Sequence, residues 1–167
     1  EREEALSTVR SNADHLLTLI NDLLDVSRAE AGAIRIEYEE VDLPDLINRA
    51  VVPLRLRAME KGILFEVEGI HSLPERVVMD RTRVRQVLLN LLSNAVKFTD
   101  SGRVRLSLDA SSDMLTLRVL DTGPGISDEE REQLFTPFTQ LGVYEKRIQG
   151  TGLGLTITRH LLGLMGG

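Results

Sequence analysis

Polar side chains in the segment 80–99 recur at a spacing that could place them around a charged ligand. Asn90, Asn94 and Lys97 stand four and three residues apart. On an α-helix, at about 100° per residue, they share one stripe with Arg83 and Gln86. Carboxamide oxygens suit a hard cation such as Mg²⁺, and the lysine ammonium could neutralise phosphate groups. The stripe therefore indicates a cation and phosphate site, although an ordinary solvated helix face has the same composition.

Two glycine-containing loops could supply the rest of such a site. Asp121 follows a predicted strand and precedes Gly123 and Gly125, and a buried carboxylate there can accept a hydrogen bond from an amine such as that of adenine. Guanine would present an acceptor instead. The second loop, residues 150–155, precedes an apolar helix, whose first N–H groups and positive dipole end attract phosphates. Taken singly, either loop is also compatible with an ordinary tight turn.

Composition narrows the classes of protein to consider. The 167 residues are 42% hydrophobic and 28% charged, which is enough for one ordinary core. A formal net charge of -6 argues against a nucleic-acid-binding protein, because such proteins carry a dense basic surface. The sequence has no cysteine, which excludes disulfides, thiol nucleophiles and thiolate metal sites. It contains no apolar run of the roughly 18 residues that a membrane helix needs, so we expect no membrane contact by these residues.

The first 32 residues have the pattern of a long amphipathic helix. Apolar residues alternate steps of three and four along one face, as in a helical bundle: Leu6, Val9, Ala13, Leu16, Ile20 and Leu23. Gly32 is a favoured helix stop, so we place a domain boundary there. The stripe predicts an association surface, and the alternative is a helix packed on its own domain.

The remaining residues alternate irregularly between strand and helix patterns. Strands are predicted at 33–39, 63–67, 76–79, 103–108 and 114–119, the last two as a hairpin. Helices are predicted from the N-caps Asp42 and Asp80 to about residues 61 and 98, and from the capping box of Ser127 and Glu130 to about Phe135. Because the strict rhythm of a parallel sheet is missing, we expect an α+β fold with helices layered on one mixed sheet.

In their order and spacing, these segments resemble the catalytic domain of sensor histidine kinases, whose ATP-binding fold is shared with Hsp90, DNA gyrase and MutL. The family's N box is similar to residues 90–99, its first glycine box to 121–126, its F box to 135–138 and its second glycine box to 150–155. Residues 139–149 take the place of the ATP lid. The first helix is similar to the second helix of the family's dimerisation and histidine-phosphotransfer hairpin.

The resemblance implies a two-layer α/β sandwich at 33–167, without the C-terminal strands of relatives, preceded by a partial hairpin at 1–32. It implies binding of ATP or ADP with Mg²⁺, the metal being held by Asn90 and Asn94. The implied nucleotide-binding residues are Asn90, Asn94, Lys97, Asp121, Gly123, Gly125, Ile126, Phe138, Gly150, Thr151, Gly152, Leu153, Gly154 and Leu155. Implied partners are a second copy of the chain, through the hairpin bundle, and the receiver domain of a response regulator. The implied setting is cytoplasmic, including the cytoplasmic portion of a membrane-bound sensor.

The implied activity is transfer of the ATP γ-phosphoryl to a histidine of the hairpin, for relay to the response regulator. None of His15, His71 and His160 is followed by the acidic residue of the family's acceptor motif, so we expect the acceptor to lie outside these residues and assign no catalytic residue. One alternative is an ATPase clamp of the Hsp90 type, although its glutamate base is replaced here by Asn90, which cannot accept a proton from water. The other is a non-catalytic, ATP-responsive dimerisation scaffold.

Overall fold

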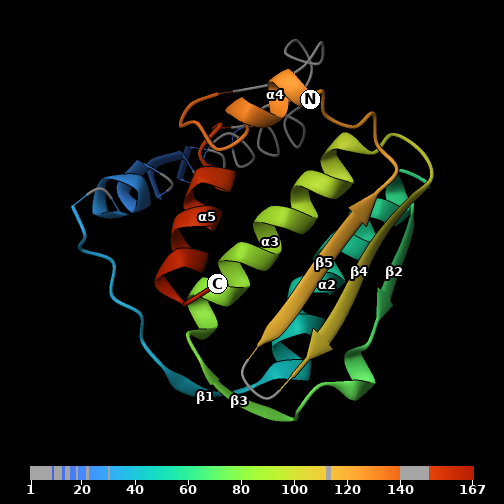
Figure 1. Ribbon diagram of the computed structural model, residues 1–167. Coiled ribbons are helices and arrows are strands. Elements are labelled where there is room, and N and C mark those ends of the chain that lie inside the picture. The colour runs from blue at the N-terminus through green and yellow to red at the C-terminus, as the bar shows by residue number, and fades with distance from the viewer. Residues whose placement is uncertain are drawn as a thin grey trace.

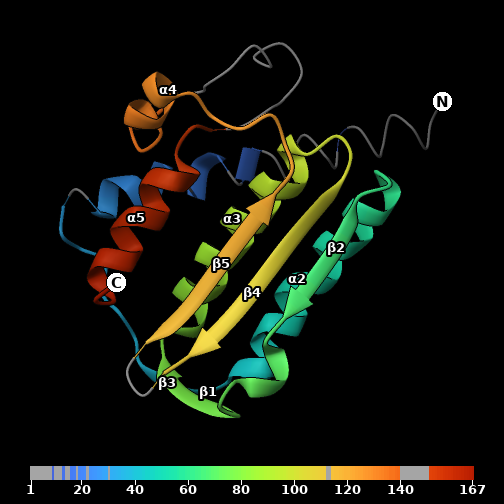
Figure 2. The ribbon, with the colours of Figure 1, turned by 45° about the vertical axis from the view of Figure 1, so that its right-hand side comes forward.

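The computed structural model has two layers, with helices packed on one face of a three-stranded sheet (Figures 1 and 2). It describes residues 9, 13, 16–17, 19–21, 23–29, 31–111, 114–139 and 151–167. The sheet consists of β2 (Leu64–Glu68), β4 (Arg103–Ala110) and β5 (Leu115–Asp121). The helices on it are α2 (Leu43–Glu60) and α3 (Arg81–Phe98). Strand β4 is parallel to β2 and antiparallel to β5, which confirms the mixed sheet, the hairpin and the two-layer α/β sandwich expected from the sequence.

Alternation along the strands separates the core from the outer face of the sheet. Val104, Leu106 and Leu108 of β4 are buried and pack in the main core with α2 and α3. The intervening Arg105 faces outward, where it pairs with Glu66 at 3.0 Å on the neighbouring strand β2. One face of the sheet therefore joins the helices, while the described part of the other face is largely polar but includes the exposed Leu64 and Leu120.

A second, two-stranded sheet pairs β1 (Glu39–Asp42) antiparallel with β3 (Arg76–Met79), and a short 3₁₀ turn, η1 (Ile70–Ser72), lies between β2 and β3. The strand predicted at 33–39 is wrong, because residues 33–38 form no ladder and β1 starts only at Glu39. Ile34 is instead buried in a cluster with residues of three helices, and the Glu37 N–H donates to the Asp80 carboxylate at 2.9 Å. The alternation there reflects packing of an extended segment on helices.

Local capping signals in the sequence set the helix starts. Asp42 accepts a hydrogen bond from the Asp45 N–H, and Asp80 accepts one from the Arg83 N–H, each at 2.9 Å. Both reciprocal bonds of the Ser127 and Glu130 capping box are present at the start of α4 (Asp128–Gln133). These predicted N-caps are therefore confirmed.

The first helix contacts the rest of the molecule near its carboxy-terminal end, through Asp25 and Val26. Residues 23–29 are helical, and the helix stops at Gly32, where φ is +61° and the Gly32 N–H donates to the Ala29 carbonyl. Leu16, Ile20 and Leu23 are about half exposed, whereas Val26 is buried. The role of residues 1–32 in a bundle stays a prediction.

Helix α5 (Gly154–Leu164) lies beside α3, on the side away from α2 (Figures 1 and 2). A second core cluster forms where α3, α5 and the end of the first helix meet. Its buried members are Val26, Ile34, Val87, Leu153, Ile157 and Leu161. Within the described ranges, no helix has both the length and the apolar character needed to cross a membrane.

Candidate functional site

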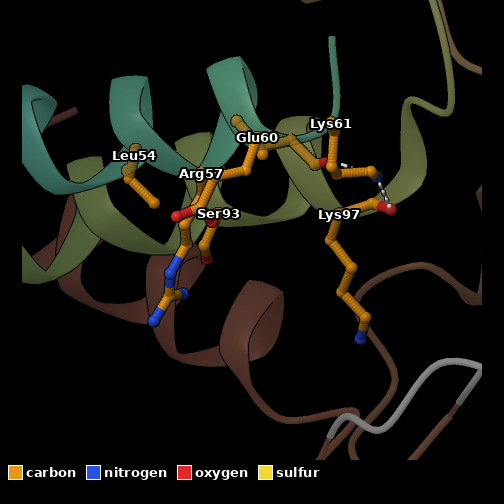
Figure 3. A pocket seen from close by; sticks show the side chains of 7 residues that line it. Leu54, Arg57, Glu60, Lys61, Ser93 and Lys97 are labelled. Atoms are coloured by element: carbon orange, nitrogen blue, oxygen red, sulfur yellow. Dashed lines mark hydrogen bonds between the residues drawn. The ribbon is translucent and has the colours of Figure 1, made fainter. Parts of the chain in front are cut away.

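Helix α3 carries the predicted polar stripe and is anchored at both ends. At its start, the buried Asp80 carboxylate bonds the N–H groups of Arg83 and Glu37. At its other end, the Lys61 ammonium donates to the carbonyl oxygens of Val96 at 2.8 Å and Thr99 at 2.6 Å, as well as to that of Lys97 (Figure 3). A cation at this end also complements the helix dipole. These anchors fix the position of the stripe.

The structure divides this stripe into two parts. Arg83 and Gln86 hold Asp25 of the first helix: Gln86 Nε2 donates to Asp25 Oδ2 at 2.7 Å, and Arg83 Nη1 lies 3.4 Å from Asp25 Oδ1. The Arg83 guanidinium also donates to Gln86 Oε1 at 3.0 Å, and the Arg83 and Asp25 side chains are largely shielded from solvent. The amino-terminal half of the stripe is thus a protein contact, which the sequence alone did not reveal.

Asn90 opens the second part of the stripe and contacts the start of α5. Its Nδ2 donates to Thr158 Oγ1 at 2.8 Å. Its carboxamide also fills the space where a side chain on Gly154 would lie, since a Cβ there would overlap the amide and come within 2.8 Å of its Cγ. The structure therefore brings the N box and the second glycine loop together, and a side chain at 154 would displace the Asn90 carboxamide.

Thr158 was not among the predicted site residues. It stands four residues after Gly154, so helical periodicity places both on one face of α5. That spacing was the available signal for its contact with Asn90. Asp25 had no comparable signal, because its partners lie 58 and 61 residues away along the chain.

Asn94 and Lys97 continue the stripe and are both half-buried. The Lys97 ammonium lies 5.0 Å from the centre of the Phe98 ring. Burial lowers the pKa of Lys97, because desolvation disfavours the charged form. The Lys97 side chain extends away from α2 (Figure 3). A phosphate next to this ammonium would favour its charged form.

The first glycine loop begins where β5 ends. Asp121 follows Val119 at the two-residue spacing that puts both on the helix-facing side of the sheet. Asp121 is nevertheless exposed, not buried as expected, although its cross-strand partner Val104 is buried in the core. Its Oδ1 accepts a hydrogen bond from the Gly123 N–H at 2.9 Å, which shapes the loop. Gly125, at φ +76°, and the exposed Ile126 complete it.

The F box and the second glycine loop lie against each other. A Cβ on Gly152 would come within 2.7 Å of the Phe138 carbonyl carbon. Thr156 of α5 donates to the Phe135 carbonyl at 2.9 Å, and the Arg159 guanidinium lies 5.2 Å from the Phe135 ring centre. Helix α5 thereby positions both segments.

The residues predicted in the second glycine loop have different surroundings. Leu153 is buried in the second core cluster, so it anchors the loop, and its N–H donates to Thr151 Oγ1 at 3.0 Å. Leu155 is half-buried, and Phe138 is exposed at φ +62°. Gly150 lies outside the described residues, as do residues 140–149 of the predicted lid.

A hollow of about 370 Å³ lies elsewhere, between the carboxy-terminal parts of α2 and α3 (Figure 3). Its lining residues are Leu54, Arg57, Glu60, Lys61, Ser93, Val96 and Lys97. Only Lys97 is shared with the predicted nucleotide site. Neither glycine loop contributes to the hollow, so we do not assign the nucleotide to it.

Residues 79–167 match the family of histidine kinase-, DNA gyrase B- and HSP90-like ATPases. Since this match covers more than half of the chain, the chain belongs to that family. The N box, both glycine loops and the F box all fall within the matched region.

Individual relatives point to the histidine kinase branch of the family. The cell-division control histidine kinase PdhS of Brucella ovis is 38% identical over 94% of this chain, which spans 16% of that protein. Full-length ShkA in complex with AMPPNP matches 98% of this chain and 34% of its own, with a TM-score of 0.80 and 36% identity. The histidine kinase ThkA in complex with the response regulator TrrA matches 93% of this chain and 42% of its own, with a TM-score of 0.65 and 25% identity. The chain thus spans only part of these relatives.

Proposed function

We propose that this chain is the ATP- and Mg²⁺-binding catalytic part of a two-component sensor histidine kinase. The contact between Asn90 and the start of α5 carries the proposal. It brings the carboxamide, a cation ligand by chemistry, next to the helix end whose backbone N–H groups suit phosphates. Among the described residues, no side chain caps the first N–H groups of α5, which suits an anionic ligand there.

The remaining predicted residues fit a nucleotide extended along α3. Asp121 would face the adenine amine, and the phosphates would lie between the second glycine loop and Lys97. Asn90 and Asn94 would hold Mg²⁺, which neutralises phosphate charge when it is bound. The donor set fits this cation, because carboxamide oxygens are hard ligands and phosphate oxygens can complete the coordination.

The proposed reaction transfers the γ-phosphoryl group to a histidine nitrogen. The bond to the ADP leaving oxygen breaks, a phosphorus–nitrogen bond forms, and the imidazole loses its proton to the acidic residue that follows the acceptor. This chain would contribute positioning and charge neutralisation, which supply most of the catalysis in phosphoryl transfer. Asn90 cannot act as a general base towards water, so the proposed site favours transfer over hydrolysis.

Two partners follow from this function. A second copy of the chain would associate through the stripe of Leu16, Ile20 and Leu23, which is exposed. A response regulator receiver domain would take the phosphoryl group from the histidine; ThkA, to which this chain is similar, forms a complex with the response regulator TrrA. The cytoplasmic setting also stays part of the proposal.

Incubation with γ-labelled ATP tests the proposal. We expect residues 1–167 to bind ATP without accumulating phosphohistidine, and to label a separately added hairpin that bears a histidine followed by an acidic residue. His71 is exposed on η1, His160 lies on α5, and His15 is outside the described residues. The added hairpin should pair with the first helix, which raises its local concentration.

The label distinguishes the alternatives. Acid-labile label on the hairpin supports the kinase, whereas ATP binding without transfer would favour the non-catalytic scaffold. Rapid release of inorganic phosphate with no labelled protein would favour the ATPase clamp. Label on residues 1–167 alone would show that an acceptor is present among them, and His15 would then be replaced by glutamine first.

A further inference from the structure

Thr158 is a buried polar residue of α5. Among the described residues of other elements, its side chain forms a hydrogen bond with Asn90. It is 4% exposed, and its hydroxyl oxygen accepts a hydrogen bond from Asn90 Nδ2 at 2.8 Å. Around it, α5 packs on α3 through Val87, Leu153 and Ile157. The packing holds the two helices at a fixed separation, so the hydroxyl can set the orientation of the amide.

The orientation of this amide decides what it offers to a ligand. A carboxamide has one face that accepts, through Oδ1, and one that donates, through Nδ2. When Nδ2 is bound to Thr158, Oδ1 lies beside Gly154 at the start of α5, where it could bind a cation. A flipped amide would present N–H groups instead, which repel a cation. Gly154 leaves room for the carboxamide but provides no side-chain partner of its own.

We infer that Thr158 is a positioning residue for Mg²⁺: it holds the Asn90 carboxamide with its oxygen towards the metal. The inference rests on the proposed function, because it requires that Asn90 bind a cation. Partners that orient a metal ligand typically contribute 10- to 100-fold to metal affinity. Here the partner is a neutral hydroxyl and Asn94 remains, so we expect a loss of roughly tenfold.

The test compares ADP affinity with Mg²⁺ and with EDTA, by calorimetry, in matched variants. Thr158→Val keeps the shape of the side chain but removes the acceptor. It should weaken ADP binding roughly tenfold in Mg²⁺ and leave it unchanged in EDTA. Thr158→Ser restores the hydroxyl and should restore the wild-type ratio of the two affinities. Thr116→Val, on the outward face of β5, removes a half-buried hydroxyl outside the proposed site and should change neither affinity.

Two results would overturn the inference in distinguishable ways. An unchanged ratio in Thr158→Val, with a wild-type chain that binds ADP more tightly in Mg²⁺, would remove Thr158 from the metal site but leave the proposed function standing. A wild-type chain whose ADP affinity is the same in Mg²⁺ and in EDTA would overturn both the metal site and the inference.

A measurement on the wild-type chain covers the case in which Thr158→Val fails to fold. Nuclear magnetic resonance should show that the side-chain amide protons of Asn90 exchange with water more slowly than those of the exposed Asn48. Equal exchange rates would mean that the hydrogen bond to Thr158 is absent, which overturns the inference without any variant.

Discussion

The amino-terminal and carboxy-terminal halves of the polar face of α3 have similar compositions but different neighbours. Arg83 and Gln86 bind Asp25 of the first helix, whereas Asn90 contacts Thr158 and the backbone of Gly154 at the start of α5. One half therefore joins two parts of the protein, and the other faces the predicted ligand loops. A polar stripe shows that a helix face is not core, but only the packed neighbours show what that face binds.

The largest effect on nucleotide affinity should come from filling the space beside the carboxy-terminal half of the α3 polar face. In Gly154→Ala the new methyl group would overlap the Asn90 carboxamide, so either the amide or the start of α5 must move. We expect Mg²⁺-ADP affinity, measured by calorimetry, to fall by roughly tenfold or more. Displacing the metal ligand Asn90 should weaken metal binding at least as much as removing a residue that orients it.

Gly163→Ala is the matched control on the same helix. A Cβ on Gly163 would meet nothing within 4 Å, so this substitution should leave ADP affinity unchanged. It should also stabilise the helix by about 0.5–1 kcal/mol, because alanine loses less conformational entropy than glycine. Equal nucleotide affinities in the two variants would contradict the assignment of Gly154 to the site.

A slightly smaller effect is expected at the far end of the proposed nucleotide. Asp121→Asn can keep the hydrogen bond from the Gly123 N–H through Oδ1, so the loop shape should survive. The change turns one acceptor into a donor that faces the adenine amine, which costs roughly 1–3 kcal/mol for a mispaired group enclosed by ligand. ATP affinity should therefore fall about tenfold, while the exposed Asp109→Asn on β4 leaves it unchanged. Unchanged affinity in Asp121→Asn would remove the adenine assignment.

Removing the contacts of the amino-terminal half of the α3 polar face should loosen the packing of the first helix without changing nucleotide affinity. Asp25→Ala leaves Arg83 and Gln86 without their shared acceptor in a shielded position, at a cost of roughly 1–3 kcal/mol. Hydrogen exchange of residues 23–33 should become faster, and ADP affinity should stay within about twofold. Glu40→Ala breaks the shorter but exposed pair with Arg76, and should cost less than about 1 kcal/mol. A large loss of ADP affinity in Asp25→Ala would show that the two halves of α3 act as one site.

The sequence predicted those features of the fold that depend on nearby residues. The caps at Asp42, Asp80 and Ser127 involve partners three residues away, and the hairpin of β4 and β5 joins neighbouring segments. The strand predicted at 33–39 failed because alternating apolar residues also arise where an extended segment packs on helices. No local pattern distinguishes the two cases.

The candidate site shows the same dependence on distance along the chain. Asn90 and Gly154 belong to recognisable motifs, and the structure brings them together. The contact that orients Asn90 comes from Thr158, which lies outside the motifs, and Arg83 and Gln86 are held by Asp25, near the start of the chain. Their polar side chains are ordinary in composition, and only the packing of α5 and the first helix on α3 gives them a role.

The smallest effect on nucleotide affinity is expected from a substitution in the exposed part of the first helix. Ile20 is 46% exposed and lies between Leu16 and Leu23, which are also exposed, so nothing in the described part of the chain buries this stripe. If the stripe is an association surface, Ile20→Asp would bury a carboxylate in the interface and should weaken self-association at least tenfold, as measured by analytical ultracentrifugation. ADP affinity should not change, because the stripe precedes Asp25 and Val26, the residues through which the first helix contacts the rest of the protein. Val52→Asp, at an exposed apolar position of α2, is the control and should leave association intact. If Ile20→Asp instead unfolds the nucleotide-binding part, the first helix belongs to that domain, and the boundary at Gly32 is misplaced.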